Sequence, residues 1–111
     1  MSEASRIKNL PILLRRGKLK EKLVNLCKEN DIVFMALFGS FAKGDYKKKS
    51  DIDILIKFKE KRGKSLFDLL EVEEKLKNIF GRKVDLLTIG SISPYLRKEI
   101  LATKKVIYEK R

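Results

Sequence analysis

The spacing of apolar residues along the chain predicts an alternation of helices and strands. Between Lys18 and Asn30 apolar positions recur at helical spacing, which predicts a helix with an inner face of Leu19, Leu23, Leu26 and Cys27. The run IVFMALF, Ile32–Phe38, is rich in branched and aromatic residues and predicts a buried strand. Gly39–Gly44 then predicts a turn with a short helical turn.

The second half of the chain repeats this alternation. Ser65 can cap a helix over Leu66–Phe80, and Gly81 is placed to end it. We expect the inner side of that helix to carry Leu66, Leu69, Leu70, Glu73, Leu76 and Phe80. The other expected elements are strands at DIDILIKF, KVDLLTI and KVIYE, and a helix opened by Pro94. The pattern therefore predicts an α/β (α+β) fold, a mixed sheet with helices packed mainly on one face.

Two carboxylates interrupt the apolar strand that begins at Asp51. Because alternate strand residues share a face, Asp51 and Asp53 point the same way, about 7 Å apart along the strand. Two unpaired negative charges in an apolar setting cost free energy, so the pair is expected there only if a cation bound between the two carboxylates offsets this cost. Mg²⁺ fits, because it prefers oxygen ligands and is often held by one or two carboxylates and substrate phosphates.

A third carboxylate and a glycine–serine turn extend this constellation. If the strand KVDLLTI lies next to DIDILIKF, Asp85 joins the same face, and three carboxylates can hold two metal ions. Gly39 and Ser40 follow a strand directly, where backbone N–H groups and a hydroxyl suit a triphosphate. The pattern is not a P-loop, because no G-x-x-x-x-G-K-[ST] follows.

Each of these features also has a purely structural interpretation. Gly39-Ser40 alone is a turn in most proteins, and a lone D-x-D is often a solvated strand end. Asp85 alone could pair with Lys83 or Arg82. The order and strand context of all three together favour the chemical interpretation.

Composition narrows the class of protein. The 111 residues suit one domain, with residues 1–18 as a basic N-terminal segment, and no apolar run approaches a membrane span. Histidine is absent, which excludes a His-based zinc site or a Ser-His pair, and the single Cys27 favours a packed thiol and a cytoplasmic protein. The net charge of +12 indicates either a solvated lysine-rich surface or a polyanionic ligand.

The spacing Gly39-Ser40, ten residues, then Asp51-x-Asp53 resembles the G-S-x10-D-x-D signature of the DNA polymerase β-like nucleotidyltransferases, and specifically the small branch called minimal nucleotidyltransferases. KVDLLTI resembles the strand that carries the third aspartate in that branch, and SPYLRKEILATKKVIYE its last helix and strand. The likeness covers roughly Leu19–Glu109.

This resemblance implies a nucleotidyltransferase palm in which Asp51 and Asp53 bind two Mg²⁺ ions. Asp85 would share the metal beside the attacking hydroxyl, and Gly39 and Ser40 would hold the β- and γ-phosphates of ATP. The implied reaction moves AMP to a hydroxyl, and many minimal members act as antitoxins on a HEPN-domain toxin, some by modifying a tyrosine.

Two features depart from the family pattern. Where the branch often has arginines after Gly-Ser, this chain has Phe41 and Lys43, and Lys43 keeps the charge for phosphate but not a bidentate fork. The run Lys47–Lys49 is either a solvated loop or an aid to binding phosphate or an acidic partner. A non-catalytic module that neutralises a partner by contact, and a basic nucleic-acid-binding domain, stay open as alternatives.

Overall fold

The computed structural model describes residues 18–44, 51–59 and 65–110. Helix α3 (Lys18–Glu29) leads into strand β1 (Ile32–Phe38), and the short helix α4 (Gly39–Lys43) follows without a break. The predictions for these three segments are confirmed. The predicted loops at Lys47–Lys49 and at 60–64, and the N-terminal segment 1–17, lie outside the described residues.

The remaining elements also match their predicted types. They are β2 (Ile52–Phe58), α5 (Leu66–Phe80), β3 (Val84–Thr88), α6 (Pro94–Thr103) and β4 (Lys105–Glu109). A single 3₁₀ turn, η1 (Ile89–Ser91), was not predicted and takes Ile89 out of the predicted strand. The helix boundaries follow from local chemistry. Asp68 accepts a 2.8 Å hydrogen bond from the backbone N–H of Ser65, and Gly81 ends α5 at a left-handed φ of 64°. Ser93 Oγ accepts from the N–H of Leu96, which caps α6.

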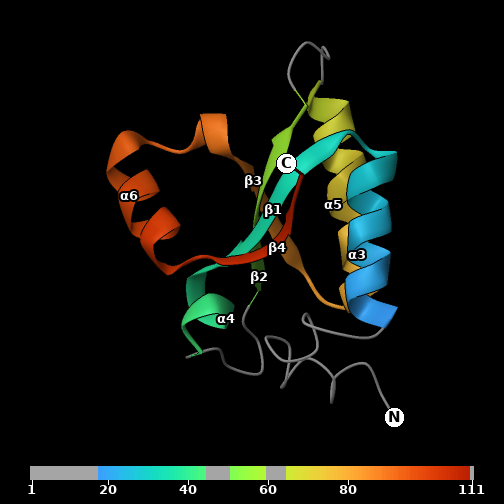
Figure 1. Cartoon of the computed structure of the whole chain (residues 1–111), viewed down its shortest axis with the longest axis horizontal. Coiled ribbons are helices and arrows are strands. Elements are labelled where there is room, and N and C mark those ends of the chain that lie inside the picture. The colour runs from blue at the N-terminus through green and yellow to red at the C-terminus, as the bar shows by residue number, and fades with distance from the viewer. Residues whose placement is uncertain (1–17, 45–50, 60–64, 111) are drawn as a thin grey trace.

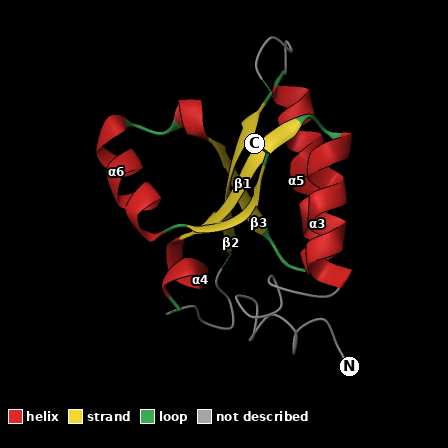
Figure 2. Ribbon diagram, in the orientation of Figure 1, coloured by secondary structure: helices red, strands yellow, loops and turns green. Residues whose placement is uncertain are grey.

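The four strands form one mixed sheet in the order β3-β2-β1-β4. Strand β1 runs antiparallel to both β2 and β4, whereas β2 and β3 run parallel. Figures 1 and 2 show α3 and α5 together on one side of this sheet and α6 on the other, with α4 at the lower end of the sheet. A parallel pair requires a crossover, and α5 provides it between β2 and β3.

The two faces of the sheet bury different sets of residues. On the side of α3 and α5, Ile52, Ile54 and Ile56 pack in the larger core with Leu23 and Leu76. On the opposite side a smaller core joins Leu55 and its neighbours to Ile100 and Leu101 of α6. The alternation along β2 therefore fixes which face each of its side chains occupies.

The predicted inner side of α5 is partly wrong. Leu66 and Leu70 are exposed, at 68% and 48% of their surface, while Val72 is buried together with Leu76 and Phe80. The helix sits rotated from the predicted orientation because burial of Val72 and Phe80, eight positions apart, aligns a stripe that excludes Leu66 and Leu70. The first turn of α5 thus leaves apolar side chains on the surface.

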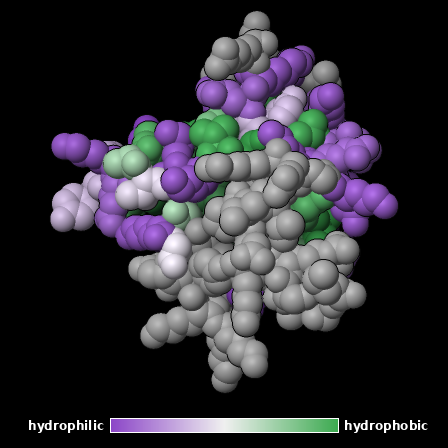
Figure 3. Space-filling model, turned by 60° about the horizontal axis from the view of Figure 1, so that its bottom comes forward, coloured by the Kyte–Doolittle hydropathy of each residue, from purple (hydrophilic) through white to green (hydrophobic). Residues whose placement is uncertain are grey.

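The surface agrees with the composition. In Figure 3, hydrophilic side chains spread over both flanks of the visible face, and hydrophobic ones show only in small areas between them. Among the described residues, no helix is long and apolar enough to cross a membrane.

Candidate active site

Strand pairing brings two of the predicted carboxylates side by side. Asp53 of β2 is the direct register partner of Asp85 of β3. Because Asp53 alternates with Ile52 and Ile54, it lies on the face opposite α3 and α5, the face that Leu55 shares. The prediction for Asp85 depended on these two strands being neighbours, and they are. The predicted proximity of Asp53 and Asp85 is therefore confirmed.

The pKa of Asp53 shows that the acidic groups lie close enough to affect one another. Its pKa is raised from 3.8 to about 6, first by burial, then by the charge of Asp85, then by that of Asp51. Burial disfavours the charged form of a carboxyl, and neighbouring negative charges disfavour it further. The three carboxylates therefore repel one another, and a bound cation would remove the cost of holding them ionised.

Gly39 brings the backbone of the predicted phosphate turn against this group. It follows Phe38, the antiparallel partner of Asp53, and adopts a φ of +71°. A Cβ atom at position 39 would collide with the carboxylate of Asp53. Only glycine combines this backbone conformation with such a close approach, so the Gly-Ser turn and the acidic strand meet directly.

Asp51 precedes β2 and is held by a lysine from the neighbouring strand end. Lys83 Nζ lies 3.9 Å from Asp51 Oδ2, and both side chains are substantially exposed. The structural interpretation pairs Asp85 with Lys83 or Arg82; of these two, Lys83 meets Asp51. Sequence reasoning missed the contact between Lys83 and Asp51. The available signal was the two-residue spacing of Lys83 and Asp85, which predicts that both point to one face if the strand includes Lys83.

Lys43, predicted to contact phosphate, is directed toward α6. Its Nζ lies 3.5 Å from Glu99 Oε1, and both side chains are exposed. The structure therefore ties α4 to α6 through this pair and does not bring Lys43 onto the carboxylates. The side chains of Ser40 and Phe41 lie outside the described part of the structure, so their predicted roles stay predictions.

The carboxylates present fit a Mg²⁺ site whose remaining coordination positions are filled by water and substrate phosphates. Asp53 and Asp85 are register partners, Asp85 is exposed to solvent, and burial together with the charges of Asp85 and Asp51 destabilises the ionised form of Asp53. Among the described residues no group of three or more His, Cys, Asp or Glu side chains could hold a metal ion, so water and substrate phosphates would have to complete the coordination. Mg²⁺ usually keeps several waters and takes substrate phosphates as further ligands, so an open arrangement matches its coordination.

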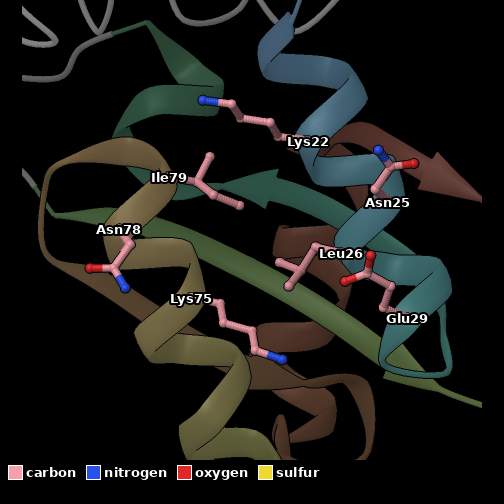
Figure 4. Close-up of a pocket in the computed structure, with 7 residues that line it drawn as sticks. All are labelled: Lys22, Asn25, Leu26, Glu29, Lys75, Asn78 and Ile79. Carbon is pink, nitrogen blue, oxygen red and sulfur yellow. The ribbon is translucent and has the colours of Figure 1, made fainter.

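A groove between α3 and α5 is less suited to such chemistry. Figure 4 shows Lys22, Glu29 and Lys75 among the side chains that line it, on the two helices. Lys75 forms an ion pair with Glu71 at 3.1 Å and donates a hydrogen bond to Asn30 Oδ1 at 3.3 Å, so its positive charge is already balanced by a neighbouring carboxylate. It also lies on the face of the sheet opposite the carboxylates, which leaves the face of Asp53 as the candidate active site.

Comparison with known proteins identifies the family of this chain. The sequence profile of the family described as "Polymerase beta, Nucleotidyltransferase" matches residues 21–111. A candidate protein adenylyltransferase of Methanocaldococcus jannaschii is 39% identical over 85 residues, which cover 77% of this chain and 89% of that protein.

Solved structures show the same fold. A candidate minimal nucleotidyltransferase superposes with a TM-score of 0.68 at 30% identity, covering 78% of this chain and 86% of its own. A complex of an MNT antitoxin with the tri-AMPylated HEPN toxin of Shewanella oneidensis gives a TM-score of 0.62 at 22% identity, over 83% of this chain and 71% of that chain. The profile covers most of the chain, including Gly39, Asp53 and Asp85. The chain therefore belongs to the polymerase β-type nucleotidyltransferases, and it is a nucleotidyltransferase of the minimal branch.

Proposed function

We propose that this protein transfers AMP from ATP to a hydroxyl of a partner protein, a tyrosine of a HEPN-family toxin, and thereby acts as its antitoxin. The acceptor oxygen forms a bond to the α-phosphorus, the bond to the β-phosphate oxygen breaks, and pyrophosphate leaves. The proton of the acceptor hydroxyl passes to a base as the new bond forms. No further co-reactant is needed for this balance.

The observation that carries the proposal is the meeting of Gly39, Asp53 and Asp85 at one end of the sheet. Phosphate transfer depends mainly on positioning and on stabilising negative charge, which requires a phosphate site and metal ligands to be contiguous. A glycine backbone in contact with a carboxylate supplies that contiguity. Such a contact is hard to explain as packing, because it forces an acidic side chain to lose solvent.

The roles of the residues follow from their exposure. Asp51 and Asp53 would hold two Mg²⁺ ions, which supply charge neutralisation for the phosphates and lower the pKa of the acceptor hydroxyl. Asp85 is exposed, so an incoming acceptor can reach its carboxylate oxygens, which would help accept the proton. Gly39 and Ser40 would bind the β- and γ-phosphates, and Lys43 would add charge there after leaving Glu99.

The partner is inferred from relatives. The M. jannaschii relative is a candidate protein adenylyltransferase, and the S. oneidensis complex contains an AMPylated HEPN toxin. Asp85 is exposed to solvent, so a folded partner can present its own hydroxyl to this carboxylate.

Intact-mass spectrometry tests the proposal. The protein is incubated with a HEPN-family partner, ATP and Mg²⁺, and the partner should gain one or more AMP units. Asp53→Asn, which preserves shape and removes charge, should abolish the gain. Glu29→Gln makes the same kind of change in the α3–α5 groove and should leave it intact. Equal labelling by Asp53→Asn and the unmodified protein would refute metal-dependent transfer through Asp53.

A second candidate function, neutralisation of a partner by contact alone, rests on a separate surface. Leu66 and Phe67 in the first turn of α5 are 68% and 82% exposed, and Leu70 lies on the same side one turn later. Clustered apolar side chains on a highly charged protein are typical of interaction surfaces. Inhibition of the partner at equal stoichiometry, without any gain in mass and without Mg²⁺, would favour this function over transfer.

A further inference from the structure

Lys83 pairs with one of the carboxylates predicted to bind metal. Its ammonium lies 3.9 Å from Asp51 Oδ2, and Asp51 is near enough to Asp53 to raise the pKa of that carboxyl. Asp51 contributes to the raised pKa of Asp53, so the positive charge of Lys83 sits within an excess of negative charge. A lysine in that position partly compensates the carboxylates in the absence of metal.

The backbone of Lys83 is fixed to the strand that follows Asp51. The carbonyl of Lys83 accepts a 3.0 Å hydrogen bond from the N–H of Ile52, and Val84 then pairs with Ile52 in the parallel ladder. The backbone from which the lysine side chain extends is therefore fixed beside Asp51, while the side chain as a whole is 75% exposed. A flexible, exposed head on a fixed root can leave the carboxylate without disturbing the sheet.

We propose that Lys83 is an internal counter-ion for Asp51 that competes with the metal for this carboxylate and so sets the metal concentration at which the site fills. This inference rests on the proposed function, because it assumes that Asp51 is a metal ligand. The ammonium holds Asp51 until a divalent ion arrives, then turns into solvent. Removing the lysine would therefore tighten metal binding, although it also removes a charge that could attract phosphate.

Coulomb's law bounds the size of the effect. A single positive charge about 5 Å from a divalent ion in a water-like dielectric opposes binding by up to roughly 15-fold without salt, and screening by salt brings this below about tenfold. We therefore expect Lys83→Gln to bind metal about 3- to 10-fold more tightly at low ionic strength, with the gain shrinking in high salt.

Manganese binding to the full chain without nucleotide measures this directly. Mn²⁺ stands in for Mg²⁺, and the electron paramagnetic resonance signal of the unbound ion gives the dissociation constant. Lys83→Gln should tighten binding, and Lys83→Arg, which keeps the charge, should remain close to the unmodified protein. Lys105→Gln is the matched control, because Lys105 pairs with Leu37 at the same end of the sheet but on β4, two strands from β2.

The outcomes separate the inference from the proposed function. Equal affinities for Lys83→Gln and Lys105→Gln would overturn the inference while leaving metal binding and transfer intact. An unmodified protein that binds no Mn²⁺ without nucleotide would also overturn the inference, whereas AMP transfer, in which substrate phosphates complete the metal site, is judged separately by the gain in mass of the partner. A specific gain for Lys83→Gln that Lys83→Arg does not share would establish competition by charge.

Discussion

Substituting Gly39 by alanine tests the contact on which the candidate site depends. Two separate penalties apply to this change. The φ of +71° places a non-glycine residue in the left-handed region, at a cost of about 1–2 kcal/mol. The new Cβ would also collide with the carboxylate of Asp53, and overpacking of this kind costs roughly 1–3 kcal/mol. Together they predict a loss of about 2–5 kcal/mol in the free energy of unfolding.

Gly44 provides the control for the backbone penalty. Its φ is +81°, similar to that of Gly39, but a Cβ at this position meets no atom within 4 Å. Gly44→Ala should therefore lose only about 1–2 kcal/mol. The excess for Gly39→Ala over Gly44→Ala measures the collision with Asp53.

Urea unfolding at neutral pH with a chelator present gives these free energies by linear extrapolation. A double-mutant cycle then identifies the colliding group. In an Asp53→Ala background the carboxylate is gone and only the Cβ of residue 53, 3.3 Å from the new Cβ, remains in the way, so most of the excess cost of Gly39→Ala over Gly44→Ala should disappear. The reasoning fails if the two glycine variants are equally destabilised, or if the excess survives in the Asp53→Ala background.

Three further predictions concern ionisation and packing. The folded pKa of Asp53 lies near 6, above its usual 3.8, so the contribution of this carboxyl to stability is greatest below about pH 4 and is lost as pH rises through 6. Asp53→Asn should therefore gain stability over the parent protein across this range, by about 1 kcal/mol after allowing for solvent exposure, and a difference in unfolding free energy that does not change with pH would contradict this. Burial raises the pKa of the Cys27 thiol from 9.0 to about 12, so a thiol reagent at pH 8 should label it only as fast as the protein unfolds, and stoichiometric labelling on mixing would refute its burial. Ile54→Ala should cost about 2–5 kcal/mol in urea unfolding, whereas Leu66→Ala should cost less than about 0.5 kcal/mol, and similar costs would show that the first turn of α5 is packed after all.

Local sequence determined the elements and most of their limits. The strands at Ile32–Phe38 and Lys105–Glu109 and the helix at Leu66–Phe80 have the bounds that their apolar runs and capping residues predicted. These features depend on neighbours a few positions apart, whose relative directions the backbone geometry of a helix or strand fixes. The same alternation predicted Asp51 and Asp53 on one face, but β2 begins at Ile52, so only Asp53 has its direction fixed by the strand.

Tertiary structure decided everything that depends on residues distant along the chain. The parallel register that sets Asp85 beside Asp53, the approach of Gly39 to that carboxylate, and the pairing of Lys83 with Asp51 all require the order of the strands in the sheet. The rotation of α5, which buries Val72 and exposes Leu66, was likewise beyond periodicity, because two apolar stripes were available and only packing on the sheet chose between them. Sequence therefore specified which side chains could act together, and the long-range pairing of strands determined which of them meet.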